Sequence, residues 1–219
     1  MRDSLTITID HIRRESSDVV TLYFARPFDF IAGQYISVYF DDLGVPEGKA
    51  YSLSSRPTDA LASITVKDIG GPWSSRLCRM KAGDTLQISR AYGYFNPHTD
   101  APLVGIAAGV GLSPVWSVLA SDDDARHCLH FANTHDSHIP FRDELATLET
   151  RVTHYISRQA DTMYHRGRME IEHVVAQAEA EAHYLICGSM TFVRDIFHQL
   201  EQQGIARSHI STEVFFEHL

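Results

Sequence analysis

The 219-residue sequence has few cysteines and no long apolar run. Its three cysteines, Cys78, Cys128 and Cys187, stand far apart, with no CxxC pair. A structural zinc site or an iron–sulfur cluster usually needs about four well-spaced ligands, so we expect the chain to carry neither. No stretch approaches the roughly 20 apolar residues that span a bilayer, and the N-terminal residues lack the apolar stretch of a signal peptide. We expect a cytoplasmic protein without a membrane segment, and sparse cysteines fit such a reducing compartment.

Positive charge is also scarce. The chain has 19 Lys and Arg residues but 28 Asp and Glu residues, which gives a net charge of −9. Non-specific nucleic-acid binding rests on cations that neutralise phosphates, so this balance argues against a nucleic-acid partner. The 13 histidines are scattered, and only His135 and His138 lie close together, in a polar stretch. We interpret them as solvated surface residues and predict no metal site.

The first half of the chain has the alternating, β-branched composition that is typical of strands. The predicted strands are residues 5–9, 19–24, 34–40, 49–55, 63–67 and 85–89. Glycine and proline residues between these segments mark turns at short intervals. Short strands joined by regular turns predict an antiparallel β-barrel, which we assign to residues 1–98.

The second half changes to a pattern in which strands alternate with helices. Its predicted strands are residues 103–108, 128–132, 152–157, 183–187 and 210–216, and its predicted helices lie at 114–119, 141–145 and 192–200. The wholly apolar run 103–108 is expected of a strand that is buried on both faces. This order predicts an α/β domain with a parallel sheet over residues 99–219, after the polar segment 96–102.

Two segments of the predicted barrel are candidates for binding a phosphate and a flat ring. Side chains alternate along a strand, so Lys49 and Tyr51 project to the same side. The segment Gly70-Gly71-Pro72-Trp73-Ser74 precedes a predicted short helix that ends near Met80, and its backbone can cradle a phosphate. It can equally be a plain turn with a serine N-cap.

Two segments of the α/β domain follow strands at the edge where dinucleotides bind. The first, residues 109–114, is not the G-x-G-x-x-G fingerprint, since Pro114 stands in the first turn of the next helix. No acidic residue ends the second strand, which weakens the ordinary dehydrogenase interpretation, and a βα turn without a ligand stays possible. The second is Cys187-Gly188-Ser189, whose thiol we interpret as a small buried group rather than a nucleophile. Glu213, in the last strand, can be an ordinary solvated carboxylate.

Taken in order, these segments resemble the motifs of the ferredoxin–NADP⁺ reductase family over almost the whole chain. The family motif R-x-Y-S appears as residues 49–52, G-G-x-x-S as 70–74, a motif close to G-G-T-G-I-T-P as 108–114, C-G-P as 187–189 and E-x-F as 213–215. Lysine replaces the arginine at position 49, so the charge is kept but the planar fork that grips phosphate is lost. Ala108, Val110 and Ser189 replace the usual glycine, threonine and proline. The resemblance implies a barrel that binds FAD and an α/β domain that binds NADPH or NADH.

The resemblance also implies a role for individual residues. Tyr51 would stack on the isoalloxazine ring and Ser52 would hydrogen-bond near its N5, with Phe215 or Phe216 as an aromatic neighbour. Ser52, Cys187 and Glu213 would form the catalytic set. The flavin phosphates would contact Lys49, Gly71 and Ser74, and the dinucleotide would contact Gly109, Gly111, Ser113, Cys187 and Gly188. The remaining implied cofactor contacts are Ala50, Val66, Lys67, Gly70 and Pro114.

The expected function is hydride transfer from NAD(P)H to FAD and electron transfer to a separate acceptor, namely ferredoxin or an oxygenase component. Ser157 and Arg158 follow the third strand of the α/β domain and Arg166 comes soon after, which favours NADPH because arginine suits a 2′-phosphate. The alternative is that these arginines are merely exposed. A second interpretation is a flavin reductase that acts on free flavin, and a third is a non-catalytic redox-sensing or regulatory subunit. Tight co-purification of flavin would favour the electron-transfer enzyme over the flavin reductase.

Overall fold

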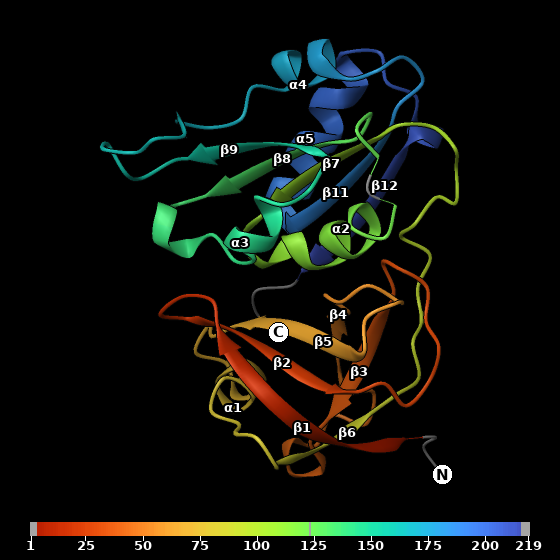
Figure 1. Cartoon of the computed structure of the whole chain (residues 1–219), viewed down its shortest axis with the longest axis vertical. Coiled ribbons are helices and arrows are strands. Elements are labelled where there is room, and N and C mark those ends of the chain that lie inside the picture. Colours follow the sequence, from red (N-terminus) through yellow and green to blue (C-terminus); the bar gives the residue numbers. More distant parts are fainter. Residues whose placement is uncertain (1–3, 123, 216–219) are drawn as a thin grey trace.

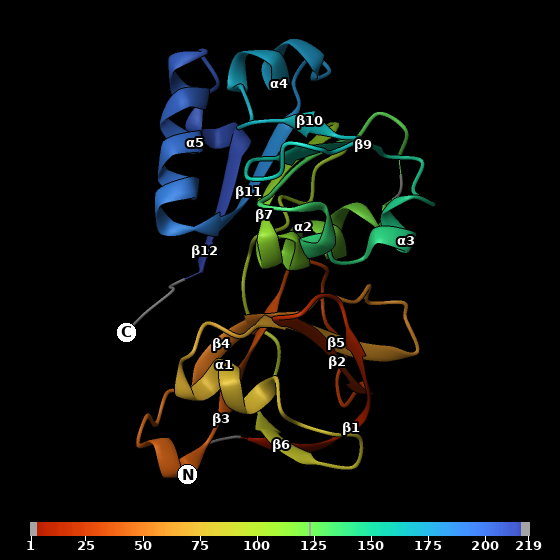
Figure 2. The same ribbon diagram turned by 90° about the vertical axis from the view of Figure 1, so that its left-hand side faces the viewer.

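The computed structural model describes residues 4–122 and 124–215, which form two β-sheets stacked along the long axis of the molecule (Figure 1). The first six strands make one sheet and the last six make the other. Turned by 90°, the molecule shows the same division, with α4 above the upper sheet and α5 along its left side (Figure 2). The predicted fold class, an antiparallel barrel followed by a parallel α/β domain, is confirmed.

The N-terminal sheet is antiparallel and closes on itself. Its strands are β1 (Leu5–Arg14), β2 (Val19–Ala25), β3 (Tyr35–Tyr39), β4 (Lys49–Ser52), β5 (Leu61–Lys67) and β6 (Thr85–Ile88), in the order β4-β3-β6-β1-β2-β5. The short helices η1 (Asp41–Leu43) and α1 (Pro72–Leu77) lie between strands. Strand β4 ends at Ser52. An isolated bridge between the next residue, Leu53, and Ile64 of β5 joins the two edges of the sheet.

The C-terminal sheet is parallel throughout. Its strands are β7 (Leu103–Ala108), β8 (Cys128–Asn133), β9 (Arg151–Ile156), β10 (His165–Arg166), β11 (His183–Ser189) and β12 (Ile210–Phe215), in the order β10-β9-β8-β7-β11-β12. The helical segments are η2 (Gly109–Gly111), α2 (Leu112–Leu119), η3 (Asp136–His138), α3 (Arg142–Leu145), α4 (Ile171–Gln177), α5 (Met190–Gln202) and η4 (Arg207–His209). Strand β10 and helix α4 were not predicted, since a two-residue exposed strand carries no periodicity.

The parallel sheet is covered on both faces, as the apolar run of β7 requires. Side chains of α2 pack on one face, and those of α4 and α5 pack on the other. The α2 core also contains Ala32 and Phe95, which precede the predicted boundary between residues 98 and 99. That boundary stays a prediction, because the apolar core continues across it.

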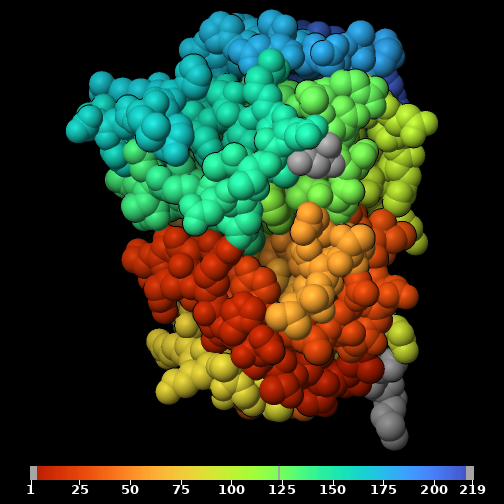
Figure 3. Space-filling view, viewed as in Figure 1, coloured from red at the N-terminus to blue at the C-terminus, as the bar shows by residue number. Residues whose placement is uncertain are grey.

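The two domains are in contact across most of the width of the molecule in this view (Figure 3). Helix α2 lies directly on the barrel, where the Ser117 hydroxyl donates a hydrogen bond of 2.7 Å to the carbonyl of Ser55. Within the described part of the chain, no helix is long and apolar enough to cross a membrane. Phe216, one of the two predicted aromatic neighbours of the flavin, lies outside the described residues.

Candidate active site

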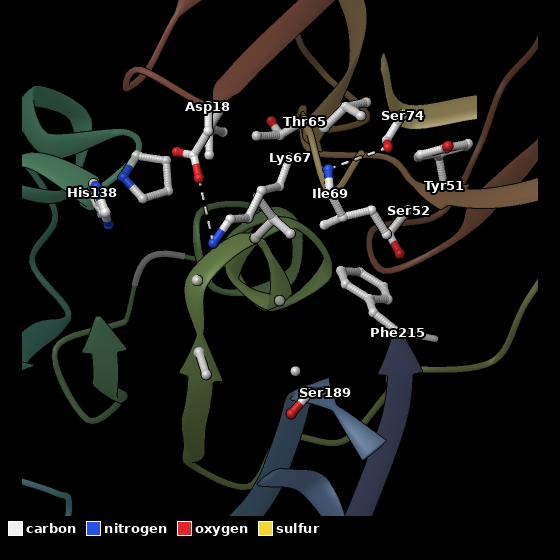
Figure 4. Close-up of a pocket in the computed structure, with 18 of the residues that line it drawn as sticks. Asp18, Tyr51, Ser52, Thr65, Lys67, Ile69, Ser74, His138, Ser189 and Phe215 are labelled. Atoms are coloured by element: carbon white, nitrogen blue, oxygen red, sulfur yellow. Dashed lines mark hydrogen bonds and ion pairs between the residues drawn. The ribbon is translucent and has the colours of Figure 1, made fainter. Parts of the chain in front are cut away.

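A cleft of about 570 Å³ lies between the barrel and the C-terminal ends of the parallel strands. That volume is within the range of typical small-molecule sites. Figure 4 shows barrel side chains projecting into the cleft from one side and Ser189 and Phe215 from the other. The predicted site residues that line it are Lys49, Ala50, Tyr51, Ser52, Val66, Lys67, Ser74, Gly109, Gly111, Ser157, Gly188, Glu213 and Phe215.

Strand β4 contributes its whole length to the wall of the cleft. The Tyr51 ring packs against the apolar core of the barrel, and its hydroxyl is buried without a hydrogen-bond partner among the described residues. Burial raises the pKa of Tyr51 above its ordinary value, so the side chain stays a neutral phenol. An unpaired buried hydroxyl is costly, which makes Tyr51 a candidate for contact with a ligand.

The predicted phosphate cradle is a tight turn before α1. Gly70 has a φ of +77°, a conformation that favours glycine. The Asp68 carboxylate accepts hydrogen bonds from the backbone N–H of Gly70 at 2.9 Å and from the hydroxyl of Ser75 at 2.6 Å. Ser74 lines the cleft, and its hydroxyl accepts a hydrogen bond from the N–H of Ile69 at 3.3 Å (Figure 4). Gly70 and Gly71 shape the turn but do not line the cleft.

The glycine turn after β7 forms the opposite wall. Gly109 has a φ of +54°, and a Cβ atom built there would meet no atom within 4 Å. At Gly111 a Cβ would lie 2.4 Å from the carbonyl oxygen of Cys187, so only glycine lets the turn pack against β11. Ser113 is buried, and its hydroxyl donates to the carbonyl of Val110 at 2.9 Å. Neither Ser113 nor the buried Pro114 lines the cleft.

At the end of β12, Glu213 meets the barrel. The hydroxyl of Ser52 donates a hydrogen bond to the Glu213 carboxylate across the cleft. Burial disfavours the charged carboxylate and raises the pKa of Glu213 to about 7, although the Ser52 hydrogen bond opposes the shift. The ring of Phe215 lies next to Ser52 (Figure 4).

Cys187 lies beside this contact but is enclosed by the protein. Its side chain is completely buried in the core beneath α2, and it does not line the cleft. Burial, together with the nearby Glu213 carboxylate, raises the pKa of the Cys187 thiol well above its ordinary value. A neutral, enclosed thiol agrees with the interpretation of Cys187 as a small buried group.

A second group of charges occupies the other end of the cleft. Lys67 Nζ lies 3.5 Å from the Asp18 carboxylate, and His138 faces them from the second domain (Figure 4). Burial favours the neutral form of Asp18, but the Ser16 hydroxyl and the charges of Lys67 and His138 outweigh it and hold the pKa of Asp18 below its ordinary value. His138 Nδ1 is 2.9 Å from the hydroxyl of Thr134, at the end of the neighbouring strand.

Known proteins share both the sequence pattern and the fold. Residues 106–198 match the family model described as an oxidoreductase NAD-binding domain. The ferredoxin reductase component of 3-ketosteroid-9-alpha-monooxygenase from Rhodococcus rhodochrous is 27% identical over 97% of this chain and 65% of its own length. Flavohemoprotein B from Dictyostelium discoideum is 26% identical over 98% of this chain and 60% of its own.

Solved structures extend the similarity to the arrangement of both domains. The FAD/NAD binding domain of nitric oxide dioxygenase from Vibrio cholerae O1 biovar El Tor superposes with a TM-score of 0.85, at 24% identity over 98% of this chain and 99% of that one. A ferredoxin NADP⁺ reductase from Neisseria gonorrhoeae gives a TM-score of 0.83, at 22% identity over 99% and 100% of the two chains. The chain therefore has an oxidoreductase NAD-binding domain and the two-domain fold of ferredoxin–NADP⁺ reductase-like proteins. It spans about 60% of the length of the curated relatives that it matches.

Of the residues predicted to bind a 2′-phosphate, only one reaches the cleft. Ser157 lines it, whereas Arg158 and Arg166 are exposed and do not. The backbone N–H of Arg158 donates to the carbonyl of Thr134 at 2.9 Å, which ties the end of β9 to the end of β8. Arg166 lies on the edge strand β10, farther along the sheet. Their contact with a nucleotide stays a prediction.

At the second end of the cleft, Lys67 was predicted as a cofactor contact, whereas Asp18 and His138 were not. Asp18 becomes a neighbour of Lys67 because Val19 pairs with Lys67 across β2 and β5. His138 was interpreted only as a solvated histidine. Neither residue belongs to a motif, and no local pattern reveals which distant strands will pair.

Proposed function

We propose that the chain is a flavin-dependent NAD(P)H oxidoreductase that passes electrons to a separate acceptor. The observation that carries the proposal is the hydrogen bond from Ser52 to Glu213. It joins the end of the proposed flavin strand to the last strand of the NAD-binding domain, at the cleft that both domains line. When bound, FAD would accept a hydride from NAD(P)H and release the electrons singly or in pairs.

The residues of the barrel fit a flavin. The buried Tyr51 hydroxyl lacks a partner among the described residues, and the Tyr51 ring stands in the cleft wall. Lys49 supplies a cation on the same strand, and Ser74 a hydroxyl at the start of α1. We propose that Lys49, Ala50, Tyr51, Ser52 and Val66 hold FAD, together with Gly70, Gly71, Ser74 and Phe215. Lysine at position 49 would hold phosphate as a point charge rather than through a bidentate fork.

The turn after β7 fits the diphosphate of NAD(P)H. The space above Gly109 is open, which leaves room for a ligand. Lys67 lines the same cleft and supplies a positive charge. We propose that Gly109, Gly111 and Lys67 bind the dinucleotide, with Gly188 beside the nicotinamide. Ser113, Pro114 and Cys187 would act from beneath this surface by holding the turn and β11 in place. Ser157, Arg158 and Arg166 would favour NADPH over NADH.

Glu213 is suited to hold a proton at the reacting end of the cleft. A carboxyl whose pKa is about 7 is present in both protonation states near neutral pH, which is the condition for efficient proton exchange. Its hydrogen bond with Ser52 fixes the orientation of both groups. We propose that Ser52 and Glu213 orient the two rings and that Cys187 only limits the space behind them.

For the acceptor we propose an oxygenase component or a ferredoxin. Support comes from the Rhodococcus rhodochrous relative, which is a ferredoxin reductase component of a monooxygenase. Similarity to the N. gonorrhoeae ferredoxin NADP⁺ reductase, which contains FAD and NADP, supports the choice of cofactors.

The proposal is tested by a visible spectrum of the purified protein, with added FAD where needed, and by anaerobic titration with NADH and with NADPH. We expect a bound flavin that is bleached by either nucleotide, faster by NADPH. Absence of flavin binding, or a flavin that neither nucleotide reduces, would contradict the proposal. A colourless protein that turns over free flavin would instead indicate a flavin reductase. Failure to oxidise NAD(P)H with any artificial acceptor would favour a regulatory subunit.

A further inference from the structure

A group of interdomain contacts lies outside every family motif, where the β1–β2 hairpin meets the start of α3. Figure 3 shows this side of the molecule, with the α3 region resting on the N-terminal strands. Arg13 and Glu15 come from the barrel, and Phe141 and Glu144 come from the second domain. We call these four residues the clasp.

The centre of the clasp is a buried carboxylate with three donors. Glu15, whose side chain is only 6% exposed, accepts hydrogen bonds from Arg13 Nε at 2.7 Å and from the Thr21 hydroxyl at 2.7 Å. The third donor is the backbone N–H of Phe141, at 3.1 Å, which belongs to the other domain. A buried carboxylate that loses a donor pays a desolvation cost, so separating the domains here is unfavourable.

Arg13 strengthens the same junction in two further ways. Its Nη1 donates to the carboxylate of Glu144, on α3. Its guanidinium lies 5.2 Å from the centre of the Phe141 ring, within the range of a cation–π contact. Arg13 therefore binds the second domain through both a carboxylate and an aromatic face.

Phe141 is held in an unfavourable backbone conformation by contacts on both sides. Its φ of 55° is in the left-handed region, which is unfavourable for a residue other than glycine. Its buried ring is stacked on Trp116, with centres 5.6 Å apart and planes 7° apart. Trp116 belongs to α2, the helix that begins at the glycine turn of the cleft. The contacts thus run continuously from the barrel hairpin through Phe141 to the cleft wall.

We infer that the clasp sets the angle between the two domains, and that Arg13, Glu15, Phe141 and Glu144 are positioning residues for the reaction. The inference rests on the proposed function, since transfer between two bound rings depends on their separation. A misplacement of about 1 Å can lower such a rate by about 100-fold. The clasp anchors α2 away from the reacting end, while Ser52 and Glu213 close that end.

The test compares Arg13→Met and Glu15→Gln with a matched control, Arg14→Met. Arg14 is the next residue of β1, and its side chain donates to the carbonyl of Ser17 within its own hairpin. Nitroxide-bearing unnatural amino acids at the exposed positions Asp29 and Glu172 report the distance between the domains. We expect a broader distance distribution in both clasp variants and an unchanged one in Arg14→Met. Identical distributions in all three variants would overturn the inference.

The functional readout separates positioning from general damage. In the FAD-loaded clasp variants, we expect the saturating rate of flavin reduction by NADPH to fall about 10-fold. FAD affinity and reoxidation by ferricyanide, which do not depend on how the nicotinamide is placed against the flavin, should stay as in the wild type. A broadened distance with an unchanged saturating rate would overturn the positioning role. If Arg13→Met does not fold, Arg13→Lys, which keeps the charge but loses the fork, should give an intermediate distance and rate.

Failure of the proposed function can be distinguished from failure of the clasp inference. It would appear as a wild-type protein whose flavin NADPH does not reduce. The distance measurement needs neither cofactor, so it decides whether the clasp holds the domains even in that case. A wild-type protein that is reduced normally, with clasp variants that match Arg14→Met in distance and rate, would reject the clasp alone.

Discussion

The two ends of the cleft shift the pKa of a carboxyl group in opposite directions. Glu213 is half-buried, with the hydroxyl of Ser52 as its hydrogen-bond donor, and its pKa is raised to about 7. Asp18 lies beside Lys67 and His138 at the more exposed end, and its pKa is lowered. Burial without a cation favours the protonated carboxyl, whereas nearby cations favour the charged form. One end is thus suited to hold a proton and the other to balance charge around a phosphate.

The largest effect should come from removing the carboxyl of Glu213. In Glu213→Ala we expect flavin reduction by NAD(P)H to slow by about 100-fold, the low end of the range for a positioned acid or base. Stopped-flow absorbance of the FAD-loaded protein measures the rate, and the flavin should stay bound. Glu201→Ala, at a glutamate of α5 that does not line the cleft, is the control and should react normally. Unchanged reduction kinetics in Glu213→Ala would remove Glu213 from the proposed site.

The raised pKa of Glu213 also predicts how stability changes with pH. Between pH 4.5 and about 7 the folded protein keeps a proton on Glu213 that the unfolded chain has released. The stabilisation is therefore complete below pH 4.5 and is lost as the pH rises through 7. We expect the free energy of unfolding of the wild type, relative to Glu213→Gln, to fall by about 3 kcal/mol over this window. Urea unfolding at a series of pH values measures it, and a difference that is independent of pH would contradict the shift.

At the charged end, removing the cation should weaken nucleotide binding. In Lys67→Met we expect the Kd for NADP⁺ to rise about 10-fold, since a charge-assisted hydrogen bond contributes about 1.5–3 kcal/mol. Isothermal titration calorimetry measures the affinity. Lys81→Met, on the exposed turn after α1, is the control. Equal affinities in the two variants would exclude Lys67 from the dinucleotide site.

The smallest effect should come from removing the partner of that cation. Asp18→Asn frees Lys67 from a partly exposed ion pair, which contributes at most about 1 kcal/mol. We expect NADP⁺ to bind about 3-fold more tightly, and the gain should disappear when Lys67→Met is also present. Weaker binding in Asp18→Asn would mean that Asp18 contacts the nucleotide itself, and the two ends of the cleft would then be more alike than proposed.

The elements that were predicted correctly are those with a strong local pattern. Residues 103–108 form the central strand β7, because an uninterrupted apolar run is stable only where both faces of a sheet are covered. Helix α2 was predicted to begin at Pro114 but begins at Leu112, since the preceding turn already has helical geometry. Helix α4 was overlooked, although Ile171, Val174 and Val175 have helical spacing.

The sequence by itself determined the two-domain fold and the strand ends at which the cleft would form, because strand periodicity and glycine turns act over a few neighbouring residues. Only the tertiary structure decided which of those residues reach the cleft, and it left Cys187 and Ser113 beneath its surface. It also decided that Asp18 meets Lys67 and that Glu15 binds Phe141. Such contacts depend on strand pairing and domain docking between distant segments, and burial there sets the charge of each group.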